Sequence, residues 1–321
     1  MIKLLLGFLT AAGIACSASA ETPYPTKPIR LVVTLAPGSQ PDIVARVLAE
    51  RMQASLGQPV IVENRPGADG TIGTELVARS AADGYTLLYA LGGSLTVAPA
   101  LYGSRVRYES EKDFAPITQT VRTTVFLTAN AAFPASDLKS LASYTSTHPR
   151  TTTLGHTAGT PYLMALLLRQ AVSDAAELVA YKGNSEVATD LLAGRIQAGL
   201  SSLPGVQPYI KGGKLKALAV LSPSRSDLMP EVPSSAEEGF SDFNADTWNA
   251  VLAPAGTPAT VIERLHREIV RILAAPEIRE RLTNAGVEIK TSNPTLLAQL
   301  IRDDKARWTK VIADFHVTTE K

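Results

Sequence analysis

Short apolar runs alternate with segments whose apolar residues recur at helical spacing, and this alternation constrains the fold most strongly. Residues 29–35 (IRLVVTL) form a near-continuous apolar run, typical of a strand that is buried on both faces. Asp42 is expected to cap a helix after this strand. The apolar positions of that helix are Ile43, Val44, Val47, Leu48 and Met52. Strands at 60–63 and 86–90, with a helix at 74–80 between them, complete a pattern that predicts an α/β fold with a parallel, helix-covered sheet.

The same alternation resumes in the second third of the chain. The predicted strands are 125–128, 152–154, 178–181, 197–200 and 215–221, and the predicted helices are 138–143 (capped by Ser136), 162–170 and 186–193. One more strand is predicted at 248–252, before helices marked by apolar residues over 261–273 and 296–311. A chain of 321 residues fits two domains, but no Pro/Gly/Ser-rich linker separates two halves. We therefore expect the chain to cross between domains more than once, near Phe114–Thr124 and near Ser241–Trp248.

The first twenty residues, MIKLLLGFLTAAGIACSASA, have the composition of an export signal. Lys3 provides the positive charge, Leu4–Ala15 is an apolar stretch too short to span a bilayer, and Ala18–Ala20 is an A-x-A cleavage site. We predict a signal peptide over residues 1–20, a mature chain that begins at Glu21, and a periplasmic location. The alternatives are an uncleaved membrane anchor and a lipoprotein attached through Cys16.

Composition excludes several classes of function. The chain has 31 basic and 30 acidic residues, so a basic footprint for nucleic acid is not expected. Its single cysteine excludes an intrachain disulfide framework and a multi-cysteine metal site. The sequence has no G-x-S-x-G, no H-E-x-x-H and no phosphate-binding G-x-x-x-x-G-K-[ST] motif, and its four histidines are not paired at metal-ligand spacing. We expect no metal, no cofactor and no enzymatic activity.

Three predicted strand-to-helix junctions combine glycine with hydroxyl side chains. They are residues 36–42 (APGSQPD), 155–161 (GHTAGTP) and 181–185 (YKGNS). Helix N-termini offer free N–H groups and the positive end of the helix dipole, and glycine lets the backbone approach a ligand closely. In open parallel sheets, ligands bind beyond the carboxyl ends of the strands, where these loops lie. A small carboxylate is the expected guest, and His156 in the second loop is a further candidate site residue.

An ordered set of short motifs resembles the Bug (TctC-like) solute-binding proteins of tripartite tricarboxylate transporters. The resemblance begins with Tyr24-Pro25 and Lys27–Val33 and continues through most of the chain. The other matching segments are Pro37-Gly38 with Asp42 and Arg46, Gly57–Val60, Val62–Gly67, Gly73-Thr74, Asp83–Leu87, Pro99–Tyr102, Lys112–Pro116, Tyr181–Gly183, Gly213–Val220 and Ala253–Pro258. No one motif is decisive, but the ordered set is specific.

The resemblance implies a two-lobed periplasmic binding protein of type II (Venus-flytrap) fold. The implied lobes are residues 21–120 with 246–321, and residues 121–245. The family closes on a small carboxylate and passes it to membrane permease subunits. Carried over, the ligand-gripping residues are Pro37, Gly38, Ser39, Asp42, Thr157, Gly159 and Thr160, with Ser94, Tyr181, Lys182 and Gly183 as weaker candidates.

The chain departs from the family pattern at three places. Ser39 stands where the family usually has a second glycine, and residues 155–160 replace the usual S-x-G-x-G-T/S loop. Ser201 and Ser202 stand where an acidic residue often follows the strand, which favours a plain carboxylate over an amino acid. We expect a monomer that binds no nucleic acid. The rival hypotheses are a ligand sensor for a signalling receptor and an exported hydrolase that depends on His156.

Overall fold

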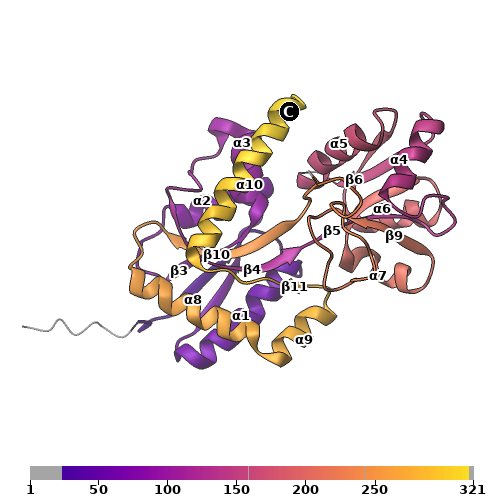
Figure 1. The fold of residues 1–321 in the computed structure, drawn as a ribbon. Coiled ribbons are helices and arrows are strands. Elements are labelled where there is room, and N and C mark those ends of the chain that lie inside the picture. The colour runs from indigo at the N-terminus through magenta and orange to yellow at the C-terminus, as the bar shows by residue number, and fades with distance from the viewer. Residues whose placement is uncertain (1–23, 158, 242, 318–321) are drawn as a thin grey trace, which may run out of the picture.

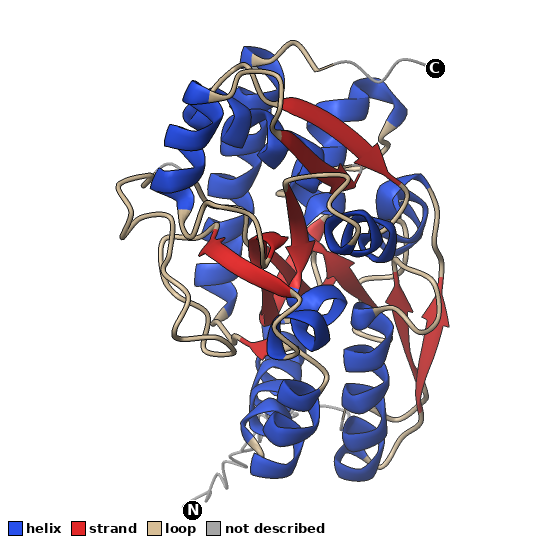
Figure 2. Ribbon diagram, turned by 90° about the vertical axis from the view of Figure 1, so that its right-hand side faces the viewer, coloured by secondary structure: helices blue, strands red, loops and turns tan. Residues whose placement is uncertain are grey.

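Two α/β halves lie side by side in the computed structural model, which describes residues 24–157, 159–241 and 243–317 (Figure 1). The predicted signal peptide and Glu21 lie outside the described residues, as does Ala158 of the second loop. Each half has one β-sheet with helices packed on it (Figure 2). The α/β class predicted from the alternating pattern is confirmed.

The first sheet places the predicted parallel strands at one edge. Its order is β11 (Glu288–Ile289), β4 (Phe114–Thr123), β10 (Thr247–Pro254), β3 (Thr86–Leu91), β1 (Ile29–Val33) and β2 (Val60–Asn64). Strand β1 pairs in parallel with β2 and β3, as the strand–helix–strand pattern predicts. Strand β10 inserts antiparallel between β3 and β4, so this sheet is mixed.

The second sheet is mixed in the same way. Its order is β7 (Glu177–Tyr181), β6 (Thr153–Thr157), β8 (Ala198–Ser202), β5 (Val125–Asn130) and β9 (Leu215–Val220). Strand β6 runs parallel to β7 and β8, whereas β5 runs antiparallel to β8 and β9. In both sheets the parallel strands therefore end at one edge, and their carboxyl ends lead into helices.

Apolar helix faces cover both faces of each sheet. On the first sheet, α1 (Gln40–Leu56), α8 (Ala259–Ala274) and α9 (Pro276–Asn284) share one core cluster, while α2 (Thr71–Ala78) and α3 (Gly92–Tyr102) contribute to another. On the second sheet, α4 (Leu138–Thr147) and α5 (Thr160–Val172) pack on one face. Helices α6 (Asn184–Leu192) and α7 (Leu203–Lys211) pack on the other. Short 3₁₀ turns occur at Ala68–Gly70 and Gly103–Arg105.

Two helix starts differ from the sequence-based prediction. Helix α1 begins at Gln40 with Ser39 as its N-cap, so Asp42 is not the cap but lies within the first turn. Helix α4 is capped by Asp137 rather than Ser136. Asp137 accepts a hydrogen bond from the Ser140 N–H at 2.7 Å, and its own N–H donates to Ser140 Oγ at 3.0 Å. Asp137 is the N-cap of α4 because it forms a reciprocal capping box with Ser140.

Helix α10 (Pro294–Asp314) lies against both halves (Figure 1). Leu297 and Ile301, in its first half, belong to the core cluster between the first sheet and α3. Trp308 and Val311, in its second half, belong to the cluster that contains α4 and α5 of the other half. The chain otherwise passes between the sheets through Thr124 and returns through residues 221–246. One helix thus contributes side chains to both cores.

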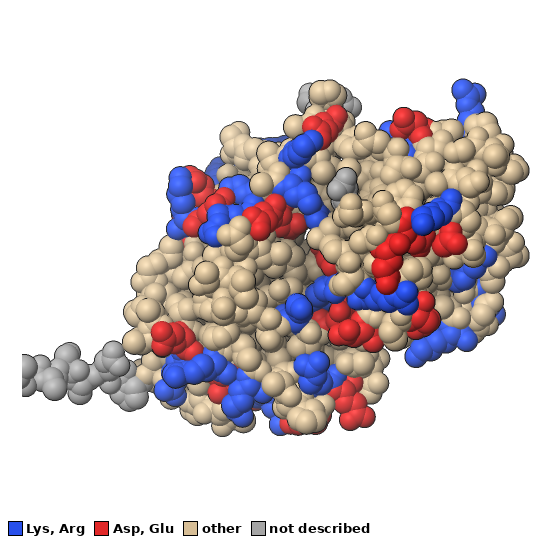
Figure 3. All heavy atoms as spheres, in the orientation of Figure 1, with Lys and Arg blue, Asp and Glu red and all other residues tan. Residues whose placement is uncertain are grey.

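On the face shown in Figure 3, basic and acidic side chains lie interspersed, so neither sign of charge predominates there. Among the described residues, none of the helices has both the length and the apolar character needed to cross a membrane.

Candidate functional site

The candidate site lies where the carboxyl ends of the parallel strands in one half face those in the other half. Strands β1 and β3 of the first sheet lead into α1 and α3, and strands β6 and β7 of the second sheet lead into α5 and α6. The two halves touch there, because a Cβ placed on Gly93 would lie 3.5 Å from Thr160 Oγ1. The N-terminus of α3 therefore faces the N-terminus of α5 across the boundary between the halves.

The first loop turns through Gly38 onto α1. Gly38 has a φ of +81°, and a Cβ built there meets no atom within 4 Å, so the turn needs glycine for its conformation and leaves open space beside it. Ser39 Oγ donates to Ala36 O at 2.7 Å, and no side chain caps the helix. The start of α1 thus keeps N–H groups that can face an anion.

The carboxylate of Asp42 holds the first loop in place through hydrogen bonds. Its carboxylate accepts hydrogen bonds from the Gly38 N–H at 2.8 Å, from Arg46 Nε at 3.0 Å and from Asn64 Nδ2 at 2.9 Å. Burial raises the pKa of Asp42, but the hydrogen bonds from Arg46, Gly38 and Asn64 outweigh burial and leave the pKa below its ordinary value. The carboxylate therefore stays ionised, with its oxygens engaged by the chain itself.

A side-chain contact joins the first loop to the connection between the halves. Gln40, the first residue of α1, donates from Nε2 to Thr123 Oγ1 at 3.0 Å. Thr123 is the last residue of β4 and pairs with Thr247, the first residue of β10. The first loop is thereby held against both strands that lead into the other half.

The second loop, like the first, has a glycine of positive φ before a helix start that no side chain caps. Gly159 has a φ of +74° with no atom within 4 Å of a built Cβ, and α5 begins directly after it without a side-chain cap. Thr157 and Thr160 are half-buried. Ala158, between them, lies outside the described residues. Hydroxyls at 157 and 160 and the start of α5 thus surround an open turn.

His156 supports the second loop from inside the half. Its side chain is only 5% exposed, its ring packs 5.1 Å from the Tyr162 ring, and its Nδ1 lies 3.0 Å from Thr157 O. Burial lowers the pKa of His156, although the hydrogen bond to Thr157 opposes that shift. The neutral imidazole holds the backbone at Thr157, and no carboxylate of residues 24–157, 159–241 or 243–317 is hydrogen-bonded to it.

The third loop is held by its own neighbours. Tyr181 Oη donates to Asp190 Oδ2 at 2.7 Å, which leaves the hydroxyl engaged. The Lys182 N–H donates to Glu186 Oε2 at 3.1 Å, and the Lys182 side chain is exposed. Beside Gly183, Asn184 Nδ2 donates to Ser202 Oγ at 3.0 Å. The starts of α6 and α7 therefore adjoin, and these polar groups of the third loop are bonded to residues of the second half.

Ser94 does not reach any ligand-accessible surface. It is fully buried, and its Oγ donates to Leu91 O at 2.8 Å and contacts Thr74 Oγ1 at 3.3 Å. Gly92 and Gly93 occupy the start of α3 in its place, and Trp248 packs so closely on Gly92 that a Cβ there would lie 2.6 Å from the indole. The glycine pair that follows the strand predicted at 86–90 is the sequence signal that could have located the start of α3.

Among residues 24–157, 159–241 and 243–317, there is no group of three or more His, Cys, Asp or Glu side chains arranged to hold a metal ion.

Comparison with known proteins gives one consistent family. Residues 44–317 match the family described as tripartite tricarboxylate transporter family receptor. Protein BugT of Bordetella pertussis is 36% identical over 310 residues, which cover 96% of this chain and 94% of BugT. The structure of the periplasmic binding protein BugD is similar at a TM-score of 0.73 and 32% identity, covering 92% of this chain and 99% of BugD. MatC of Rhodopseudomonas palustris, solved with bound malate, has a TM-score of 0.72 and 31% identity, covering 90% of this chain and 100% of MatC.

Proposed function

Because the chain belongs to the tripartite tricarboxylate transporter receptor family, we propose that it captures a small carboxylate between its two halves and delivers it to the membrane subunits of such a transporter. Membership confirms the resemblance to Bug (TctC-like) proteins and the two-sheet binding-protein fold. Proteins of this family are periplasmic solute-binding proteins. The residue-level assignments that follow are proposals.

One observation carries the proposal: the uncapped, glycine-bearing starts of α3 and α5, one from each half, meet where Gly93 faces Thr160. A carboxylate there can accept hydrogen bonds from backbone N–H groups and hydroxyls without a dedicated basic side chain. The malate bound to MatC is a small carboxylate, which supports the same class of ligand for this chain. Closure of the two halves would bury such a ligand and exclude water from it.

The proposed contacts divide into two kinds. Pro37, Gly38, Ser39, Thr157, Gly159 and Thr160 contact the ligand, with Gly93 added from α3 and Tyr181, Lys182 and Gly183 from the third loop. Asp42 and His156 instead position the two gripping loops, because their polar atoms already bind Gly38 and Thr157.

A ligand without an amino group fits this site better than an amino acid. An ammonium group needs a carboxylate partner in a site that excludes water. At the end of β8 the chain offers Ser201, which is buried, and Ser202, whose hydroxyl accepts from Asn184. We therefore propose a plain mono-, di- or tricarboxylate as the cargo.

The remaining parts of the proposal concern the whole protein. Residues 1–20 are removed on export, and the mature chain acts as a periplasmic monomer. Its lobes are residues 21–120 with 246–321, and residues 121–245. It binds its ligand without chemical turnover and passes it to permease subunits.

A thermal-shift screen of the mature protein, refolded to strip any bound ligand, tests the proposal. Mono-, di- and tricarboxylates, aromatic acids and amino acids would be compared at equal concentration. A ligand at about 100 times its Kd stabilises by roughly 2.7 kcal/mol, which raises Tm by several degrees in a chain of this size. We expect a selective hit among plain carboxylates, recovered unaltered after hours. Stabilisation by amino acids alone, or consumption of the ligand, would overturn the proposal.

A further inference from the structure

A buried ionic cluster joins the segments that connect the two halves. Arg122, near the end of β4, lies with Nε 2.7 Å from Asp246 Oδ2 and with Nη1 3.5 Å from Glu288 Oε1. Asp246 ends the segment that returns from the second sheet, and Glu288 lies on β11. The three charged side chains are between 9% and 17% exposed. A change in the angle between the halves would therefore move charged side chains that have little contact with water.

Hydroxyl groups from both connections complete the cluster. Arg122 Nη2 donates to Ser222 Oγ at 2.6 Å, and Ser222 Oγ donates to Asp246 Oδ2 at 2.9 Å. Glu288 Oε2 accepts from Thr124 Oγ1 at 3.1 Å and from Ser226 Oγ at 3.0 Å. These bonds link the outgoing chain at 122–124 to the returning chain at 222–246, so the cluster is the joint between the halves.

The joint carries one negative charge in excess. Two carboxylates, Asp246 and Glu288, share the single guanidinium of Arg122. Arg307 of α10 also faces Asp246, but its own partner is Asp304, at 3.7 Å. Asp246 Oδ1 is buried and has no hydrogen-bond partner among the described residues. Uptake of one proton at Asp246 would neutralise the joint.

We propose that this cluster is a proton-sensitive joint, in which protonation of Asp246 favours the closed arrangement and mild acid therefore tightens the hold on the ligand. The inference rests on the proposed function, because it assumes that the halves open and close around a ligand.

The direction follows from the hydration of Asp246. In the arrangement described here the halves touch at Gly93 and Thr160, and a Cβ on Gly286 would lie 2.8 Å from Pro204 Cγ across the same boundary. Burial in this arrangement raises the pKa of Asp246 to about 6, against the opposing attraction of Arg122. Opening separates the groups around Asp246 and admits water, which returns the pKa toward 3.8. The state with the higher pKa binds the proton, so acid favours closure.

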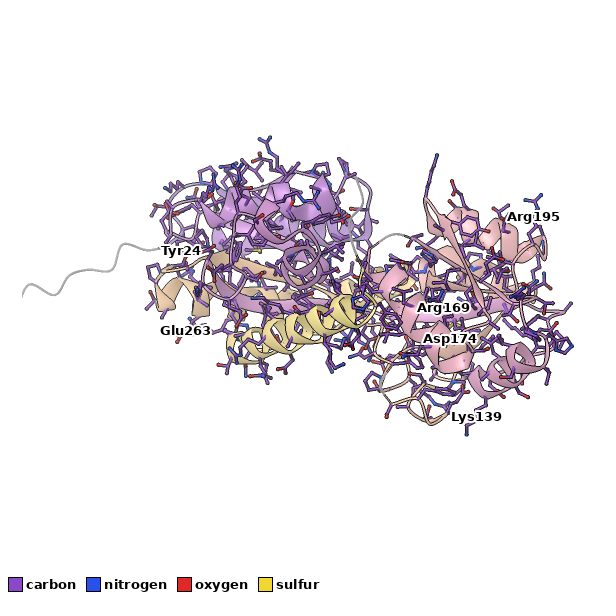
Figure 4. The ribbon with its side chains drawn as sticks, turned by 90° about the horizontal axis from the view of Figure 1, so that it is seen from above. Tyr24, Lys139, Arg169, Asp174, Arg195 and Glu263 are labelled. Carbon is purple, nitrogen blue, oxygen red and sulfur yellow. The ribbon has the colours of Figure 1, made fainter. Side chains whose placement is uncertain are left out.

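The distance between the halves can be measured without any ligand. The mature chain has no cysteine once Cys16 is removed, so Lys139→Cys and Glu263→Cys provide two spin-label positions. Both residues are exposed, and Figure 4 shows them on opposite halves. Double electron–electron resonance would compare about pH 7.5 with about pH 5.5. If the pKa falls from about 6 to 3.8 on opening, the ratio of closed to open molecules rises by about fourfold in acid.

Two variants make the test specific. Asp246→Asn should give the same closed fraction at both pH values, at least as high as that of the wild type at pH 5.5, because its amide cannot titrate. Glu237→Gln is the matched control, since it removes an exposed acid from the same returning segment, paired with Arg225, and should keep the fourfold response. An unchanged response in Asp246→Asn would overturn the proposal.

The carboxyl group of Asp246 can also be titrated directly by NMR in the wild-type protein, which avoids any variant that folds poorly. A pKa near 3.8 in the closed form would contradict the inference. A flat pH response with intact carboxylate binding would refute the joint alone, whereas loss of all carboxylate binding would refute the proposed function.

Discussion

Asp42 has a structural role in the first loop, beside the anion site that we propose. It sits in the first turn of α1, where a negative charge interacts favourably with the helix dipole. Its oxygens accept hydrogen bonds from Gly38, Arg46 and Asn64, so it fixes the backbone of the turn for which we propose ligand contact. The sequence could place Asp42 near the helix start, but not show that its charge is turned inward.

Replacing Asp42 with asparagine should destabilise the protein by about 1–3 kcal/mol at neutral pH, because buried donors lose a charged acceptor. The pKa of Asp42 is lowered in the folded state, so its contribution is present above its unfolded value and is lost as pH falls through the folded value. Urea unfolding at pH 7 and at pH 3 would show the difference shrinking in acid. Glu277→Gln, at an exposed pair, should change stability by less than about 0.5 kcal/mol.

A negative charge at position 39 should weaken ligand binding without lowering the stability of the fold. Asp is a favourable N-cap, so Ser39→Asp should fold at least as stably as the wild type. Its carboxylate would repel the ligand carboxylate in a site that excludes water, and we expect the affinity for the carboxylate found in the screen to fall by more than about tenfold. Calorimetric titration would measure this loss. Ser39→Asn, a neutral cap, should bind far better than Ser39→Asp, and equal affinities would remove the first loop from the site.

At the scale of elements, the predictions succeeded where amphipathic spacing is strong. The helix expected over 261–273 is α8, and the strand expected over 86–90 is β3. Helix α3 was missed because its sequence, GGSLTVAPALY, has no charged residue and therefore no polar face to reveal the period. Helix α7 was missed because Pro204, Gly205 and Pro208 suggest a turn. The antiparallel insertion of β10 could not be foreseen, since its partners are distant in the chain.

Helix α10 gives the clearest element-level prediction. Trp308 is 1% exposed within the core of the second half, while Leu296 on the same helix is 59% exposed. Trp308→Ala should cost about 3–5 kcal/mol of unfolding free energy, since it leaves a large cavity. Leu296→Ala should change stability by less than about 0.5 kcal/mol. Similar losses in chemical denaturation for both variants would show that the second half of α10 does not complete that core.

At the scale of the whole molecule, the site depends on an approach between halves that no local pattern contains. Three loops were predicted from glycine, hydroxyls and helix starts. The second contributes Thr160 to the contact with Gly93, and the first is bonded through Gln40 to Thr123 beside the connection between the halves. Which loops face each other is decided by the angle between the sheets. That angle is set by the joint around Arg122 and by α10, whose contacts are long-range in sequence.

Gly93 offers a graded test of closure. A Cβ at Gly93 would make ordinary contact with Thr160 Oγ1 at 3.5 Å, so Gly93→Ala should bind ligand nearly as well as the wild type. Gly93→Leu should hold the halves apart and weaken binding by at least about tenfold, with little loss of stability because the residue is in a helix with an allowed φ. Small-angle scattering with saturating ligand should show compaction for alanine but not for leucine. Compaction of both variants would contradict closure at this contact.

The position of α10 also has a consequence for biosynthesis. Residues 294–314 follow the strands of both sheets in the sequence, yet Leu297 and Trp308 pack into the cores of the two halves. A nascent chain that has not yet exposed residues 294–314 therefore lacks these side chains from both cores. We therefore expect both halves to gain stability together when α10 docks, rather than one after the other.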